Sequence, residues 1–136
     1  MSNVESGRFG CLPWVAAWFS GGAVAHAAWQ LTAWARWYCD AGYEAGGRLE
    51  LNVLLPLTAL AGGCAGLAAL ALGRAVAQPA PKAVRVLLPP VSVLVVTVLL
   101  GWWFFATVGT LDDYPGDSGR CPTTNIPPRW PAWIPA

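Results

Sequence analysis

The sequence LPPVSVLVVTVLLGWWFFATV, residues 88–108, contains no charged side chain. Outward from it, the charge-free run extends from Arg85 to Asp112 and holds 26 residues. A helix of about 20 residues, each rising roughly 1.5 Å, crosses a hydrocarbon core of roughly 30 Å. In water the β-branched residues 91–98 would favour a strand, but an isolated strand in lipid leaves its backbone groups unpaired. The stretch therefore predicts a membrane-spanning helix.

Two further runs of the chain lack charge in the same way. There are 27 uncharged residues between Arg8 and Arg36, and 23 between Glu50 and Arg74. Hydrophobic residues make up 56% of the chain and charged residues only 11%, which is too few to give a soluble domain its polar outer layer. We therefore expect an all-α membrane protein in which a domain of residues 12–110 has three transmembrane helices, at about 13–34, 51–72 and 88–108. A formal net charge of +1 argues against a nucleic-acid partner.

The two ends of the chain differ from the spans in composition. Residues 1–11 form a short polar head, and residues 111–136 form a tail with five prolines after Cys121. Proline lacks a backbone N–H, so this tail is expected to be irregular, without helix or strand pairing. An extended, polyproline-like chain on the membrane surface, anchored by Trp130 and Trp133, is the expected state.

Orientation follows from the basic residues in the short loops. The loop of residues 74–85 contains Arg74, Lys82 and Arg85 and no acidic residue. Such loops stay on the cytoplasmic side. With three spans, the head is then cytoplasmic and the tail extracytoplasmic, in the plasma (inner) membrane.

Two of the four cysteines fall on the same side in this topology. Cys39 and Cys121 both follow helix ends on the outer, oxidising side, which favours a disulfide between them. Unpaired thiols and catalytic thiols are the alternatives. The sequence contains no CxxC pair of the kind that thiol oxidoreductases use.

The second predicted span has small residues at mid-depth. Gly62 and Gly66 form a GxxxG, whose spacing places both glycines on one helix face. That face allows another helix backbone to approach closely. We therefore expect these two residues to form a helix-packing site.

His26 is the only histidine and lies near the middle of the first predicted span. Spacing of four residues places Trp18, Gly22, His26 and Gln30 on one stripe, which is expected to face protein. The stripe is compatible with a neutral histidine and a glutamine in interhelical polar contacts, or with a quinone, haem or proton contact at His26. Because there is one histidine, ligation of a haem by two histidines of the same chain is excluded.

The sequence lacks the patterns of the common catalytic sites. The predicted spans contain no Asp, Glu, Lys or Arg, so the buried carboxylate of a proton-coupled pump is missing. Motifs for phosphate loops, serine hydrolases and zinc sites are also absent. No enzyme activity, cofactor or metal is therefore predicted. The acidic residues expected on the outer side match no calcium loop, and a solvated surface is favoured over a cation site: Asp40, Glu44, Glu50, Asp112, Asp113 and Asp117.

The tail carries a resemblance to a known group of proteins. Its segments YPGDSGRCP, residues 114–122, and NIPPRWP, residues 125–131, resemble the ends of small multi-span membrane proteins of unknown function from actinomycetes. The bias toward Ala, Gly, Arg, Pro and Trp is typical of a high-GC bacterial genome. The resemblance implies a membrane location and no particular activity.

These features favour an integral membrane protein that acts as a structural or accessory partner of a membrane complex. Its expected contacts are the lipid bilayer and a protein partner or further copies of itself. Two alternatives are an oligomeric pore or carrier lined by the His26 stripe, and an accessory subunit that holds a quinone or haem at His26.

Overall fold

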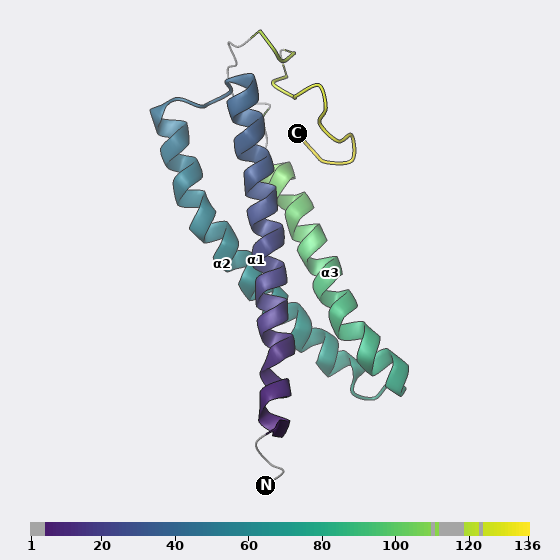
Figure 1. The fold of residues 1–136 in the computed structure, drawn as a ribbon. Coiled ribbons are helices and arrows are strands. Elements are labelled where there is room, and N and C mark those ends of the chain that lie inside the picture. The colour runs from purple at the N-terminus through teal and green to yellow at the C-terminus, as the bar shows by residue number, and fades with distance from the viewer. Residues whose placement is uncertain (1–4, 110, 112–118, 123) are drawn as a thin grey trace. The chain divides into compact units, whose positions relative to one another are not determined.

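The computed structural model describes residues 5–109, 111, 119–122 and 124–136, with side chains described from residue 10 onward. It contains three helices, α1 (Glu5–Cys39), α2 (Ala45–Ala77) and α3 (Lys82–Thr107), and no strand among the described residues (Figure 1). The expected all-α class is confirmed.

Two of the helices, rather than three, are long and apolar enough to cross a membrane. These are α2 and α3. Helix α1 is long enough, but its mean hydropathy is too low, because its uncharged run includes polar residues such as Ser20, His26 and Gln30. On this criterion the prediction of three spans is correct for two of them.

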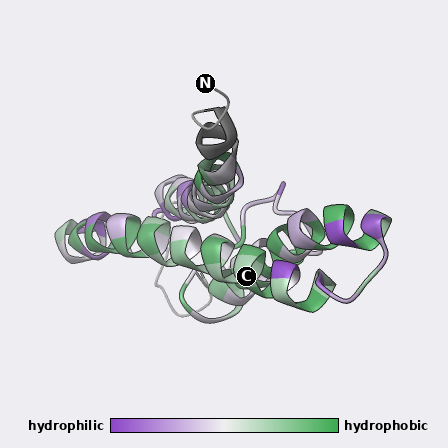
Figure 2. Ribbon diagram, turned by 90° about the horizontal axis from the view of Figure 1, so that it is seen from below, coloured by the Kyte–Doolittle hydropathy of each residue, from purple (hydrophilic) through white to green (hydrophobic). Residues whose placement is uncertain are grey.

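The apolar parts of α2 and α3 are largely exposed. In the most apolar 18-residue window of each helix, only 22% of α2 and 11% of α3 is buried. Leu72 of α2 and Leu94 of α3 are 69% and 62% exposed. Hydrophobic colours predominate along the helices in Figure 2. A core helix of a soluble protein would be mostly buried, so these two helices do not fit that alternative.

The helices extend beyond the predicted spans at several ends. Helix α1 already begins at Glu5, inside the predicted head. The third span was expected to begin at about residue 88, yet α3 begins at Lys82. The physical reason is that the carbonyl of Pro81 accepts the N–H of Arg85 at 3.1 Å, which is the first bond of the helix and makes Lys82 its first residue. Much of the basic 74–85 segment is therefore helical.

The chain divides into two compact units. The first comprises residues 1–25 and 59–99, and the second residues 26–58 and 100–136. In the first unit, all three helices contribute to a core of Ala17, Ala69, Leu70 and Val93. In the second unit, α1, α3 and the tail pack together through Ala28, Phe105, Ile134 and neighbouring side chains.

A Schellman motif ends α1 in the second unit. Asp40 adopts a left-handed conformation with φ of 54°, and the N–H of Ala41 bonds to the carbonyl of Arg36 at 2.9 Å. A second bond links the N–H of Asp40 to the carbonyl of Trp37 at 3.4 Å. These bonds satisfy carbonyls that the helix end would leave unpaired, and they fix the position of Cys39.

Candidate functional site

Gly62 and Gly66 of α2 pack against α1 within the first unit. A Cβ at Gly62 would meet the carbonyl oxygen of Gly21 and lie 2.7 Å from the Cβ of Ala25. A Cβ at Gly66 would meet the carbonyl oxygen of Ala17. We call these five residues the small-residue seam. The backbones of the two helices are in contact there, so this GxxxG face is used within the chain.

The α1 side of the seam was not singled out from the sequence. Its three residues, Ala17, Gly21 and Ala25, recur every fourth position and so share one helix face. This repeat of small residues is the same signal that identified Gly62 and Gly66. It could have indicated the partner helix.

His26 and Gln30 lie on an exposed face of α1 and contact each other. The Nε2 atoms of the two side chains are 3.4 Å apart, and the His26 ring also stacks on Trp29 with centroids 5.9 Å apart. Among the described residues, neither side chain has a hydrogen bond to another helix. The expectation that these two side chains make polar contacts to another helix stays a prediction.

Trp29 makes the interhelical polar contact instead. Its indole Nε1 donates to the carbonyl of Leu51 on α2 at 2.8 Å. A helix turns about 100° per residue, so Trp29 lies about 60° from His26 and about 100° from Gln30 around the axis of α1. The other two members of the four-residue stripe, Trp18 and Gly22, do face α2 in the first unit.

The second unit contains the disulfide that the sequence indicated. Cys39 and Cys121 are bonded, with their Cα atoms 5.4 Å apart and 82 positions apart in sequence. The bond joins the end of α1 to the tail. Cys39 itself is fully buried, beside the helix end that Asp40 terminates.

The described part of the tail consists of turns and is not an extended chain. Three backbone bonds join a proline carbonyl to the N–H three residues later: Pro122 to Asn125, Pro127 to Trp130, and Pro131 to Ile134. Proline has no backbone N–H to donate, but its carbonyl can accept a hydrogen bond. A proline-rich chain can therefore form successive turns. The expected polyproline-like conformation is therefore wrong for these residues.

The two tryptophans of the tail differ in their contacts. Trp130 packs edge-to-face on Phe105 of α3 with centroids 5.8 Å apart, and its Nε1 donates to the carbonyl of Ile134 at 3.1 Å. Trp133 is 74% exposed. Only Trp133 therefore fits the role of a surface anchor, whereas Trp130 holds the tail to α3.

Arg36 is fully buried in the second unit, although in the sequence it is the charged residue that ends the first uncharged run. Its Nη1 lies 3.5 Å from Oε2 of Glu50, whose side chain is 46% exposed. The pair links the end of α1 to the start of α2 across the loop of residues 40–44. In the sequence, this ion pair is indicated by the opposite charges of Arg36 and Glu50 on the two sides of that loop.

The acidic residues of the outer side do not form a described cation site. Asp112, Asp113 and Asp117 lie outside the described residues. Among the described residues, no three His, Cys, Asp or Glu side chains are grouped closely enough to hold a metal ion. The prediction of a solvated acidic surface stays a prediction.

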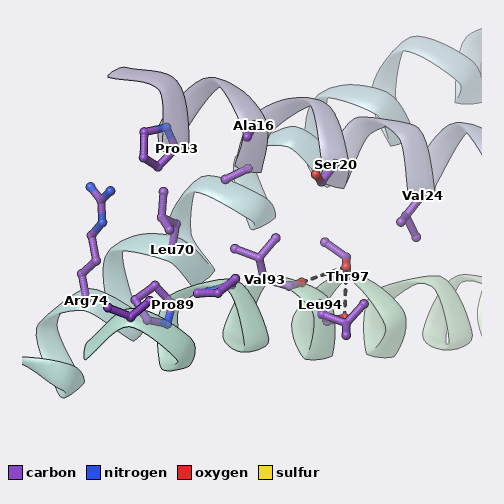
Figure 3. Close-up of a pocket in the computed structure, with 13 residues that line it drawn as sticks. Pro13, Ala16, Ser20, Val24, Leu70, Arg74, Pro89, Val93, Leu94 and Thr97 are labelled. Atoms are coloured by element: carbon purple, nitrogen blue, oxygen red, sulfur yellow. Dashed lines mark hydrogen bonds between the residues drawn. The ribbon is translucent and has the colours of Figure 1, made fainter. Parts of the chain in front are cut away.

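A groove runs between α1 and α3 in the first unit, with α2 contributing to its floor (Figure 3). It has a volume of about 500 Å³, and most of its lining is apolar. Arg74 and Pro13 lie at one end and Val24 at the other in Figure 3. The hydroxyl of Thr97 donates to the carbonyl of Val93 at 2.8 Å. Among the residues that the structure describes, Arg74 is the only charged one that lines this groove.

No protein-family model matches this chain, and no curated protein or solved structure is significantly similar to it. The resemblance of the tail to small membrane proteins of actinomycetes stays a prediction.

Proposed function

We propose that this chain is a three-span protein of the plasma membrane that serves as a structural or accessory partner of a membrane complex. The observation that carries the proposal is the exposed His26–Gln30 pair on α1. Polar side chains at membrane depth rarely face lipid, because lipid offers them no hydrogen bonds. In a membrane, this face requires a protein neighbour.

Support for α1 as the third span comes from the small-residue seam. Gly62 is the midpoint of the charge-free run 51–73 in α2, and Gly22 is the midpoint of the run 9–35 in α1. In the first unit, Gly62 contacts Gly21, the neighbour of that midpoint. If α2 crosses the bilayer, this contact supports the same depth for the centre of α1, although the hydropathy of α1 is lower.

The depth of His26 follows from its place in the charge-free run. His26 lies four residues from Gly22, the midpoint of the run 9–35, and four residues of helix correspond to about 6 Å. The hydrocarbon core extends about 15 Å to each side of its centre. In a spanning α1 the histidine is therefore well inside the hydrocarbon region. Gln30, one turn further, is about 12 Å from the centre and still inside it.

The hydroxyl groups of α2 and α3 are compatible with this environment. Thr58, Ser92 and Thr107 each donate to the carbonyl four residues earlier, at 2.8 Å. Such bonds satisfy the hydroxyls within their own helix, so these residues need no water. His26 and Gln30 differ, because each can form further hydrogen bonds.

The orientation is proposed from the basic segment between α2 and α3. Arg74, Lys82 and Arg85 lie there without a neighbouring acid in the sequence, so this end belongs in the cytoplasm. The disulfide between Cys39 and Cys121 belongs at the opposite, oxidising side. Single-cysteine labelling in intact cells tests this: Ala132→Cys should react with an impermeant maleimide, whereas Ala83→Cys and Ser2→Cys should be protected. The reverse pattern would overturn the orientation, and labelling of Ser2→Cys together with Ala132→Cys would show that α1 does not cross the membrane and would overturn the three spans.

Site-specific photocrosslinking tests the partner. Gln30→p-benzoylphenylalanine, introduced in living cells, should give a discrete protein adduct after irradiation. Leu99→p-benzoylphenylalanine is the control, since Leu99 is apolar and 60% exposed on α3 and is expected to face lipid. An adduct with another protein supports the accessory role. An adduct of twice the chain mass would instead favour the oligomeric pore or carrier, and no adduct from position 30 would refute a protein neighbour at this face.

A further inference from the structure

The geometry points to a binding site for one anionic phospholipid in the groove between α1 and α3, with the phosphate at Arg74 and an acyl chain along the groove. This inference rests on the proposed membrane location. It concerns the first unit only, because every residue that lines the groove lies in residues 1–25 or 59–99.

The length of the groove matches one leaflet of a bilayer. Along α1 the groove extends from Pro13 to Val24, and eleven residues of helix correspond to about 16 Å. Half of a hydrocarbon core of roughly 30 Å is about 15 Å. The groove therefore reaches from the level of Arg74 to near the bilayer centre, as the acyl chain of a lipid does.

The groove is charged at one end and apolar along the rest of its length. Arg74 stands at one end, and the remaining lining is dominated by aliphatic side chains and prolines such as Leu70, Val93 and Pro89. The guanidinium of Arg74 lies 4.9 Å from the ring centre of Trp14, and tryptophan is enriched at the headgroup level of membranes. One cationic end and one long apolar part complement a phospholipid.

The charge of this unit favours an anionic headgroup. Its residues include four cations, Arg8, Arg74, Lys82 and Arg85, and one acid, Glu5, which gives a formal charge of 4 − 1 = +3. Basic pockets between transmembrane helices on the cytoplasmic side are known to bind anionic lipid headgroups. Guanidinium groups bind phosphate oxygens in a bidentate geometry, which suits Arg74 in particular.

Lipid retention by the full chain tests the headgroup contact. The protein is reconstituted in nanodiscs of equal amounts of dioleoyl-phosphatidylglycerol and dioleoyl-phosphatidylcholine, and retained lipid is identified by native mass spectrometry. One retained phospholipid is expected, with phosphatidylglycerol preferred by about fivefold or more. Arg74→Gln should abolish the preference and Arg74→Lys should keep most of it. Lys82→Gln is the matched control, since Lys82 is exposed and does not line the groove, and it should change the preference less than Arg74→Gln.

Filling the groove tests the acyl-chain contact. Ala16 lines the groove and Ala23 does not, although both are exposed residues of α1. Ala16→Phe should lower the retained phospholipid severalfold and Ala23→Phe should not. Equal retention in these two variants, equal retention of both lipids by the unmodified chain, or a retained polypeptide or neutral isoprenoid in place of phospholipid would each overturn the site.

The outcomes separate this inference from the proposed function. If cysteine labelling at positions 2, 83 and 132 shows the three-span topology while lipid retention is indifferent to Arg74, the lipid site alone fails. If labelling shows that α1 does not cross the membrane, the proposed function and the lipid site fail together. Labelling of the Arg74→Gln protein also verifies that lost retention does not come from an altered topology.

Discussion

Replacing Gly21 with alanine is expected to lower the free energy of unfolding by about 1–2 kcal/mol, although alanine is the better helix former. A Cβ at Gly21 would meet the carbonyl oxygen of Gly62 and lie 2.7 Å from its carbonyl carbon. Favourable contacts between such atoms begin at about 3.5 Å, so the two helices must separate by roughly 1 Å. Overpacking of this kind costs about 1–3 kcal/mol. Alanine recovers about 0.5–1 kcal/mol of that through its helix propensity.

Gly22 provides the matched control, one residue away on the same helix. A Cβ there would lie 3.6 Å from the carbonyl oxygen of Ala59, which is an ordinary van der Waals distance. The substitution then changes only the helix propensity, so Gly22→Ala should raise the free energy of unfolding by about 0.5–1 kcal/mol. The two adjacent substitutions should therefore have opposite signs.

Unfolding of the purified protein in mixed micelles, with an increasing mole fraction of dodecyl sulfate, measures both variants. The helix signal in circular dichroism follows secondary structure, and tryptophan fluorescence follows the seam, because Trp18 packs on Gly63 beside it. The double variant Gly21→Ala/Gly62→Ala should cost less than the sum of the single ones, since both methyl groups enter the same gap. Equal effects of Gly21→Ala and Gly22→Ala, or full additivity of the double variant, would refute direct backbone contact at the seam.

Three further predictions concern the second unit. Cys39→Ser should expose the tail to protease, because it removes a constraint that the chain-entropy model values at about 4–5 kcal/mol for a separation of 82 residues. Cys64→Ser is the control: Cys64 is exposed and outside any disulfide, so the protease pattern should not change. Trp130→Ala should lower thermal stability by about 1–2 kcal/mol, because Trp130 packs on α3, while Trp133→Ala, at a 74% exposed residue, should have little effect. Asp40→Gly should raise the melting temperature and Asp40→Val should lower it, each by the equivalent of about 1 kcal/mol, since φ at Asp40 is 54°.

The helical class and the shared helix face of Gly62 and Gly66 could be predicted because each depends on short-range information. A charge-free run of more than 20 residues favours a helix in lipid regardless of its partners. The pairing of Cys39 with Cys121 followed from the order of helices and loops along the chain. The ends of the helices were less predictable, because Pro81, Pro89 and Pro90 are all compatible with a helix start. Only the hydrogen bond from the N–H of Arg85 to the carbonyl of Pro81 distinguishes them.

Composition and periodicity alone therefore determined that this chain forms long apolar helices and which residues share a helix face. They could not determine which face meets which neighbour, since a stripe of residues with four-residue spacing looks the same whether a helix, lipid or another protein covers it. The tertiary structure decided that Gly62 packs on Gly21, that Trp29 rather than His26 bonds to α2, and that His26 and Gln30 stay exposed. The physical reason is that helix pairing depends on the fit of whole surfaces at close range, to which residues distant in sequence contribute together.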